Sequence, residues 1–210
     1  KKTLLRNVDE ADGLKLHPLA WSKSGPLVRA EGLSLSYGGR TVCAGLTFTL
    51  RPGERMAVTG PNGCGKSTLL KKLCGQDVAA CGTLALGAGL IVSYVPQDAS
   101  FLHGGARDYA RNAGVDETMF LTLLRKLGFE RVQFEKDMSD YSAGQKKKVL
   151  LARSLCESAH LYLWDEPLNY IDVLSRMQIE QLLLDYRPTM LFVEHDAAFV
   201  RRAATGTLVL

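Results

Sequence analysis

The chain has 210 residues, with 26 Lys and Arg against 22 Asp and Glu, and a formal net charge of +4 at pH 7. Hydrophobic residues make up 46% of it and charged residues 23%, proportions that exclude collagen, a coiled coil or a disordered chain. It contains no run of about eighteen apolar residues, the length that a membrane-spanning helix needs. The weak positive charge permits an anionic partner but does not require one.

The five cysteines are spread along the chain without a Cys-x-x-Cys pair. An odd number in this arrangement disfavours a disulfide framework or a zinc site, and it favours a reducing, cytoplasmic location. The first residues lack the apolar segment of a secretory signal peptide. Since the chain begins with Lys1, we expect it to be a fragment of a longer protein.

Residues 1–26 carry scattered lysines and an arginine, and they end in the turn-forming sequence Ser24-Gly25-Pro26. We interpret them as the tail of an interdomain linker, with a disordered terminus as the alternative. From residue 27 onward the hydrophobic pattern predicts a single folded domain, residues 27–210.

Strand and helix patterns alternate through this domain. Predicted strands cover residues 27–30, 33–36, 41–50, 55–59, 84–86, 90–95, 160–164, 190–193 and 208–210. Predicted helices cover residues 67–74, 106–127 with an interruption at Gly114, 143–156, 173–184 and 197–203. This alternation predicts an α/β fold with a mostly parallel sheet as its core. The hairpin-like strands before residue 50 predict an antiparallel lobe at one edge.

A glycine-rich sequence joins the predicted strand 55–59 to the next helix and fits the pattern G-x-x-x-x-G-K-[ST]. Backbone N–H groups and the helix N-terminus of such a loop hold phosphate oxygens. Lys66 is expected to reach the β- and γ-phosphates of a nucleotide and Ser67 to bind Mg²⁺. A chance glycine-rich turn is the alternative, which the strand-and-helix context disfavours. The loop consists of Gly60, Pro61, Asn62, Gly63, Cys64, Gly65, Lys66, Ser67 and Thr68.

Two adjacent acids, Asp165 and Glu166, end the apolar strand predicted at residues 160–164. A parallel sheet delivers the ends of its strands to the crevice where ligands bind. Asp165 is therefore expected to hold Mg²⁺, mainly through water, and Glu166 to polarise an attacking water. The alternative is a pair of helix-capping acids before Pro167.

Further residues stand around these two motifs in a recognisable order. Tyr141-Ser142-Ala143-Gly144-Gln145 resembles the LSGGQ signature of ATP-binding-cassette (ABC) domains. Tyr37, Gln97, Asp172 and His195 resemble that family's A-loop aromatic residue, Q-loop glutamine, D-loop aspartate and switch histidine. Taken singly, Tyr37 is also typical of a strand end, Gln97 of a surface turn and His195 of a core or cap. The resemblance extends from about residue 27 to residue 210.

The resemblance implies an ABC-type fold of the P-loop NTPases, with a small helical subdomain at about residues 98–157. It also implies an ATPase that uses ATP and Mg²⁺, with Tyr37 stacking on adenine. Gln97 is then a Mg²⁺ ligand and, with Glu166 and His195, a catalytic residue.

In this family ATP is buried between two cassettes, so Ser142, Ala143, Gly144 and Gln145 are expected to act on the ATP of a partner. The partner is a second cassette upstream in the same chain, or another copy of this fragment. Two departures from LSGGQ, Tyr141 for Leu and Ala143 for Gly, are expected to preserve function, with slower turnover possible through crowding at Ala143.

Among cassettes, residues 164–176 most closely resemble the second cassette of ABC-F antibiotic-resistance proteins of the Lsa and Vga type. The short segment between Gln97 and Tyr141 and the basic tail favour the same group. That resemblance implies a ribosome-acting protein, with ribosomal RNA as partner and antibiotic resistance by ribosome protection. The alternatives are the ATPase subunit of a membrane transporter and a nucleotide-binding module with negligible turnover.

Two smaller features have two interpretations each. We interpret Lys146, Lys147 and Lys148 as the solvated, partly dipole-paired face of the helix that follows the signature, with an RNA-binding patch as the alternative. We interpret Cys64 as a small filler in the phosphate loop, with a redox-sensitive thiol as the alternative.

Overall fold

The structure is a computed structural model that describes residues 13–210. Its strands are β1 (His17–Pro18), β2 (Val28–Tyr37), β3 (Arg40–Leu50), β4 (Arg55–Thr59), β5 (Ala79–Leu86), β6 (Val92–Val95), β7 (Ser158–Ala159), β8 (Leu161–Asp165), β9 (Met190–Val193) and β10 (Gly206–Val209). Its α-helices are α1 (Lys66–Leu73), α2 (Ala106–Asn112), α3 (Glu117–Lys126), α4 (Ala143–Cys156), α5 (Val173–Tyr186) and α6 (Ala197–Ala203). Two short 3₁₀ turns, η1 (Arg131–Glu135) and η2 (Met138–Asp140), precede α4.

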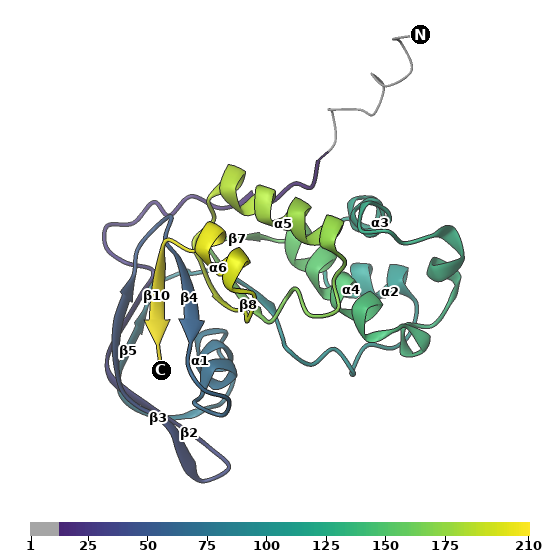
Figure 1. The fold of residues 1–210 in the computed structure, drawn as a ribbon. Helices are drawn as coiled ribbons and strands as arrows, with labels where there is room; N and C mark the ends of the chain where they lie inside the picture. The colour runs from purple at the N-terminus through teal and green to yellow at the C-terminus, as the bar shows by residue number, and fades with distance from the viewer. Residues whose placement is uncertain (1–12) are drawn as a thin grey trace.

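The core is a five-stranded sheet in the order β10-β4-β9-β8-β6, and every neighbouring pair is parallel. Figure 1 shows β10 and β4 side by side, pointing the same way. All residues of β8 and β9 are buried, as their apolar sequences require in a parallel sheet that is covered on both faces. The predicted α/β fold with a parallel core is confirmed.

The antiparallel lobe has the strand order β3-β2-β5. The two predicted strands at 27–30 and 33–36 form one continuous strand, β2, with irregular register around Gly32. Gly32 and Gly82 explain this irregularity, because a Cβ on Gly82 would lie 2.3 Å from the carbonyl oxygen of Gly32. A side chain at Gly82 would block the close approach of the two strands, and Gly32 has φ 58°, a conformation that favours glycine. The glycines thus interrupt the sequence pattern without ending the strand.

The helices α2, α3 and α4 gather on the side of the molecule away from β2, β3 and β5 (Figure 1). The predicted interruption at Gly114 separates α2 from α3, and Asp116 starts α3 by accepting a hydrogen bond from the Met119 backbone N–H. Within residues 13–210, no helix combines the length and apolar character that crossing a membrane requires.

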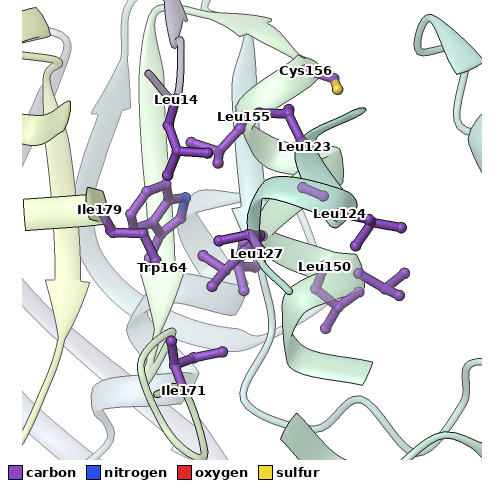
Figure 2. Packing of buried hydrophobic residues seen from close by; sticks show 14 of the residues in the cluster. Leu14, Leu123, Leu124, Leu127, Leu150, Leu155, Cys156, Trp164, Ile171 and Ile179 are labelled. Carbon is purple, nitrogen blue, oxygen red and sulfur yellow. The ribbon is translucent and has the colours of Figure 1, made fainter. Parts of the chain in front are cut away.

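The segment before β2 packs against the rest of the domain. Leu14 and Leu16 are buried in the core cluster, and Figure 2 shows Leu14 among the same side chains as Trp164. The strand β1 pairs in parallel with β7, and the backbone N–H of Leu19 donates to the carbonyl oxygen of Ala159 at 2.8 Å. Residues 14–19 are thus integrated into the fold; the first part of the proposed linker tail, residues 1–12, lies outside the described residues.

The burial of Leu16 predicts that truncating its side chain destabilises the fold. Leu16 is 2% exposed, so Leu16→Ala is expected to lower the free energy of unfolding by about 2–5 kcal/mol, the usual range for a buried leucine. Leu19 is 37% exposed, and Leu19→Ala is expected to cost less than about 1 kcal/mol. Urea unfolding followed by circular dichroism measures both values. Equal, small losses in the two variants would show that the segment does not contribute to folding.

Candidate nucleotide-binding site

A cavity of about 560 Å³ opens at the carboxyl end of the parallel sheet. This cavity brings together most of the residues that the sequence analysis assigned to one site, although they come from separate parts of the chain. Its lining is formed by Tyr37, Val42, Asn62, Gly63, Gly65, Lys66, Ser67, Thr68, Gln97, Glu166 and His195.

The phosphate loop connects β4 to α1 and depends on its glycines. Gly60 has φ 145°, and a Cβ at this position would lie 2.7 Å from the Cys64 sulfur. Gly65, with φ 98°, directly precedes α1 in the left-handed conformation that favours glycine. Cys64 thus fills space against Gly60, as a filler residue would.

The Lys66 side chain lies along the inside of this loop. Its Nζ donates to the carbonyl oxygens of Gly60 at 2.8 Å and Pro61 at 2.9 Å. An ammonium has three N–H groups, and the remaining one faces only the Cys64 sulfur, a weak acceptor at 4.0 Å. Lys66 is therefore positioned to give its third hydrogen bond to a phosphate oxygen.

Three side chains with oxygen atoms suited to bind Mg²⁺ lie in or beside the phosphate loop: Ser67, Gln97 and Asp165. The Ser67 hydroxyl donates to Gln97 Oε1 at 3.3 Å, so these two predicted ligands are neighbours. Asp165 is 1% exposed, and neither of its carboxylate oxygens has a hydrogen-bond partner. Burial raises the pKa of Asp165, against the opposing effect of the nearby Ser67 hydroxyl. A buried carboxylate without a partner is unfavourable unless a cation compensates it, so these residues fit a magnesium ion.

Glu166 and His195 form the second half of the site. His195 Nε2 lies 3.0 Å from Glu166 Oε1, and the amide of Asn169 donates to Oε2. Glu166 adopts the left-handed conformation, with φ 48°, and its N–H donates to the Val193 carbonyl at 2.9 Å. Its carboxylate is thus held from both sides. Asn169 was missed by the sequence analysis, because no pattern marks it apart from its position three residues after Glu166.

The acids at the end of β8 do not cap a helix, which removes the alternative interpretation of Asp165 and Glu166. The helix α5 begins at Val173, and its cap is Asp172, whose Oδ1 accepts from the Ser175 N–H at 2.9 Å. Partial burial opposes ionisation of Asp172, but hydrogen bonds from Lys148 and Ser175 lower its pKa overall. The predicted D-loop aspartate therefore fixes the start of α5.

The signature residues start α4 and lie outside the nucleotide cavity. Ser142 Oγ accepts from the Gln145 N–H at 3.2 Å, and Gln145 Oε1 accepts from the Ser142 N–H at 2.9 Å, a reciprocal capping box. Gly144 abuts the D-loop, because a Cβ there would lie 2.7 Å from the Tyr170 carbonyl oxygen. Ala143 lines a separate cavity of about 390 Å³, and Gln97 belongs to the lining of both cavities.

Two of the three lysines after the signature are not solvated, which corrects our interpretation. Lys147 is 2% exposed, and Lys148 donates to the Leu127 carbonyl and to Asp172 Oδ2 at 2.8 Å. The helix α4 packs against the sheet on one side and α3 on the other, so both side chains extend into protein. An RNA patch made of all three lysines is excluded for the same reason.

Tyr141, which replaces the signature leucine, has a structural explanation. Its ring is buried and lies edge-on to Phe129, with ring centroids 5.6 Å apart. Its hydroxyl donates to the Gln133 carbonyl oxygen at 2.6 Å. The tyrosine thus fills an apolar pocket and satisfies its polar end.

A phosphate loop, a buried carboxylate at the end of another parallel strand of the same sheet, and a carboxylate paired with a histidine define a P-loop nucleoside triphosphatase. The sequence pattern of the ABC transporter family matches residues 43–169. The chain therefore belongs to the ABC transporter family as an ATPase domain, a type of domain that hydrolyses ATP.

Individual relatives fall into more than one branch of this family. The chain is 32% identical over 193 residues to ATP-binding protein Uup of Caulobacter vibrioides, covering 88% of this chain and 32% of that protein. It is 30% identical over 188 residues to ribosome protection protein VmlR of Bacillus subtilis, covering 87% and 34%. It is 34% identical over 193 residues to zinc import ATP-binding protein ZnuC of Ruegeria pomeroyi, covering 88% and 75%. The chain thus spans about a third of the length of Uup and VmlR.

The isolation of the Asp165 carboxylate predicts a stability–function trade-off. In the absence of nucleotide, Asp165→Asn is expected to raise stability by about 1 kcal/mol or more, because it removes a buried charge. For a chain of this size, this corresponds to about 2–4 °C in Tm per kcal/mol. The same variant is expected to lose most of the further increase in Tm that Mg²⁺ with ATP gives the wild type. Differential scanning fluorimetry measures both effects.

The pH dependence has a definite sign. Since burial raises the folded-state pKa of Asp165 above its unfolded value, the charge destabilises the fold at pH values above the folded-state pKa and ceases to do so as acid protonates it. The gain from Asp165→Asn should therefore shrink towards low pH.

Asp185→Asn, at an exposed position on α5, is the control and should leave Tm unchanged. A lower Tm for Asp165→Asn at neutral pH would contradict the assignment.

Proposed function

We propose that this chain is one of the two ATP-binding cassettes of an ABC-F protein that acts on the ribosome in the cytoplasm, with ribosome protection against antibiotics as its role. ATP closes the pair of cassettes, and hydrolysis opens it. The pairing of two cassettes is supported by one observation, which is that the signature residues lie outside the cavity that contains the chain's own phosphate loop. One set of motifs supplies half of each of two sites, and the second cassette supplies the other halves.

Within one site, the chain's residues divide the work. Tyr37 is 64% exposed, with the Lys71 ammonium 5.7 Å from its ring centroid, so the open part of its ring can stack on a base. Lys66 and the loop N–H groups hold the phosphates. Bound through Ser67, Gln97 and Asp165, Mg²⁺ supplies positive charge against the phosphate oxygens.

Glu166 orients water and accepts its proton. The hydrogen bonds from His195 and Asn169 fix both carboxylate oxygens, so the base faces one direction. His195 has a side chain that is 56% exposed, whereas that of Glu166 is 13% exposed, so the part of the imidazole that does not bond Glu166 is open to the γ-phosphate.

One relative supports the ribosome role, and the lengths of two support a second cassette. VmlR is named as a ribosome protection protein, and both VmlR and Uup are about three times as long as the matched segment. Such lengths leave room for a second cassette in the same chain, as the proposal requires. The short helical subdomain, with α2 and α3 of 7 and 10 residues, supports the same branch over one that docks a membrane domain.

The transporter branch is the second candidate. ZnuC is 34% identical to this chain, which covers 75% of its length, so similarity alone does not separate the two. In that case the second cassette is another copy of the same subunit, and the partner is a membrane protein.

The test uses Glu166→Gln in the full-length protein that contains this cassette. Loss of a general base is expected to slow hydrolysis about 10²- to 10⁴-fold, while ATP affinity holds or rises because a negative charge is removed. The trapped protein should pellet with ribosomes through sucrose in ATP, and much less in ADP. Phosphate release and quantitative blotting of the pellets measure these outcomes.

Glu54→Gln is the matched control, since the Glu54 side chain accepts a hydrogen bond from the Arg51 N–H in a turn and does not line the nucleotide cavity. It should hydrolyse ATP at the wild-type rate. Normal hydrolysis by Glu166→Gln would remove Glu166 from the catalytic role. Slow hydrolysis without ATP-dependent pelleting would leave the ATPase intact and favour the transporter.

A further inference from the structure

Lys147 occupies an unusual environment on α4. Its side chain is buried, at 2% exposure, and its Nζ donates to three backbone carbonyl oxygens. They belong to Pro96 at 2.8 Å, Gln97 at 2.9 Å and Asp165 at 3.1 Å. Since an ammonium has three N–H groups, every donor of Lys147 is used, and each one bonds a segment outside its own helix.

The three acceptors lie at functionally important points. Pro96 and Gln97 directly follow β6, and Asp165 ends β8. The side chains of Gln97 and Asp165 are the candidate Mg²⁺ ligands, and Lys147 itself lies two residues after Gln145, the last signature residue. A single ammonium thus joins the start of the signature helix to the loop after β6 and to the end of β8, which carry the candidate metal ligands.

The charge of Lys147 is compensated at longer range. Burial lowers the pKa of its ammonium, while Asp165, Glu166, Glu194 and Asp98 act in the opposite direction. A cation among these acids can remain charged although no carboxylate contacts it directly.

The other half of α4 is fixed to the strands rather than to the loops. Trp164 Nε1 on β8 donates to Ser154 Oγ at 2.9 Å, and Ser154 Oγ lies 2.6 Å from Ser93 Oγ on β6. These groups are buried between α4 and the sheet. The loop after β6 and the last residue of β8, by contrast, carry the candidate Mg²⁺ ligands, so the Lys147 end of α4 is the end that a bound nucleotide can displace.

We propose that Lys147 is a positioning residue that couples the chain's own nucleotide site to its signature motif. When nucleotide and Mg²⁺ shift Gln97 and Asp165, the three hydrogen bonds carry the shift to the first turns of α4, where the signature meets the partner's nucleotide. The occupancy of one composite site thereby alters the geometry of the other. This inference rests on the proposed function, because it requires nucleotide binding in the phosphate loop.

Hydrogen–deuterium exchange on this 210-residue chain, with and without Mg²⁺ and a non-hydrolysable ATP analogue, tests the coupling. In the wild type, the analogue should change exchange both in peptides covering residues 60–73 and in peptides covering residues 142–152. In Lys147→Met, which is similar in length but has no donor, the first response should remain. The second should fall about fivefold or more, the low end of typical coupling between sites.

Two variants separate coupling from a general loss of structure. Lys147→Arg keeps a cation with several donors and should retain much of the α4 response. Lys72→Met removes an ammonium that donates only to the Val78 carbonyl, away from the cavity, and should respond like the wild type. If Lys147→Met does not fold, Lys147→Gln, which keeps a shorter donor, takes its place and should show the same selective loss.

The outcomes distinguish a failure of the coupling from a failure of nucleotide binding. An equal α4 response in wild type and Lys147→Met, or a wild type that responds only at the phosphate loop, would overturn the coupling and leave the nucleotide site standing. A wild type that responds at neither place would remove the proposed function and this inference with it.

Discussion

The carboxylate of Asp165, buried at the end of β8 without a hydrogen bond, is the constraint around which this domain is arranged. The parallel sheet brings it to the same edge as the phosphate loop after β4 and the histidine after β9. Burial of β8 on both faces keeps solvent from neutralising it. A fold that keeps a buried carboxylate without a hydrogen-bond partner in this position gives up stability for a site that a cation can complete.

Around that charge, main-chain groups provide much of the organisation. The Lys66 and Lys147 ammonium groups both bond backbone carbonyls, and the Glu166 N–H bonds that of Val193. Such contacts fix where loops lie, and the side chains of those loops remain available for ligand chemistry. The signature helix takes part through Lys147 rather than through the signature residues, which cap their own helix.

The sequence predicted helices and strands of several residues better than the very short strands. The bounds of β4, α4, β9 and α6 agree with their predicted ranges, because each has an apolar pattern of the right period between clear breaks. The strands β1 and β7 have two residues each, too few for any periodicity.

The positions of single side chains were also predictable only where a local sequence pattern marks them. The phosphate loop and the two acids have fixed spacing and could be placed together. The burial of Lys147 and the contact of Asn169 with Glu166 arise from tertiary packing of segments far apart or irregular in sequence. The neighbouring sequence does not indicate whether a lysine within a basic run is buried, so its charge suggested exposure.

The packing of residues 14–19 also bears on where this module begins as a physical unit. The family pattern starts at residue 43, and the hydrophobic pattern starts at residue 27, but the side chains of Leu14 and Leu16 complete the cluster that contains Trp164. A fragment trimmed to residue 27 would leave this part of the core open to water and the edge of β7 unpaired. Exposed apolar surface next to an open strand edge promotes self-association, so the trimmed module would aggregate although every nucleotide-binding motif is present.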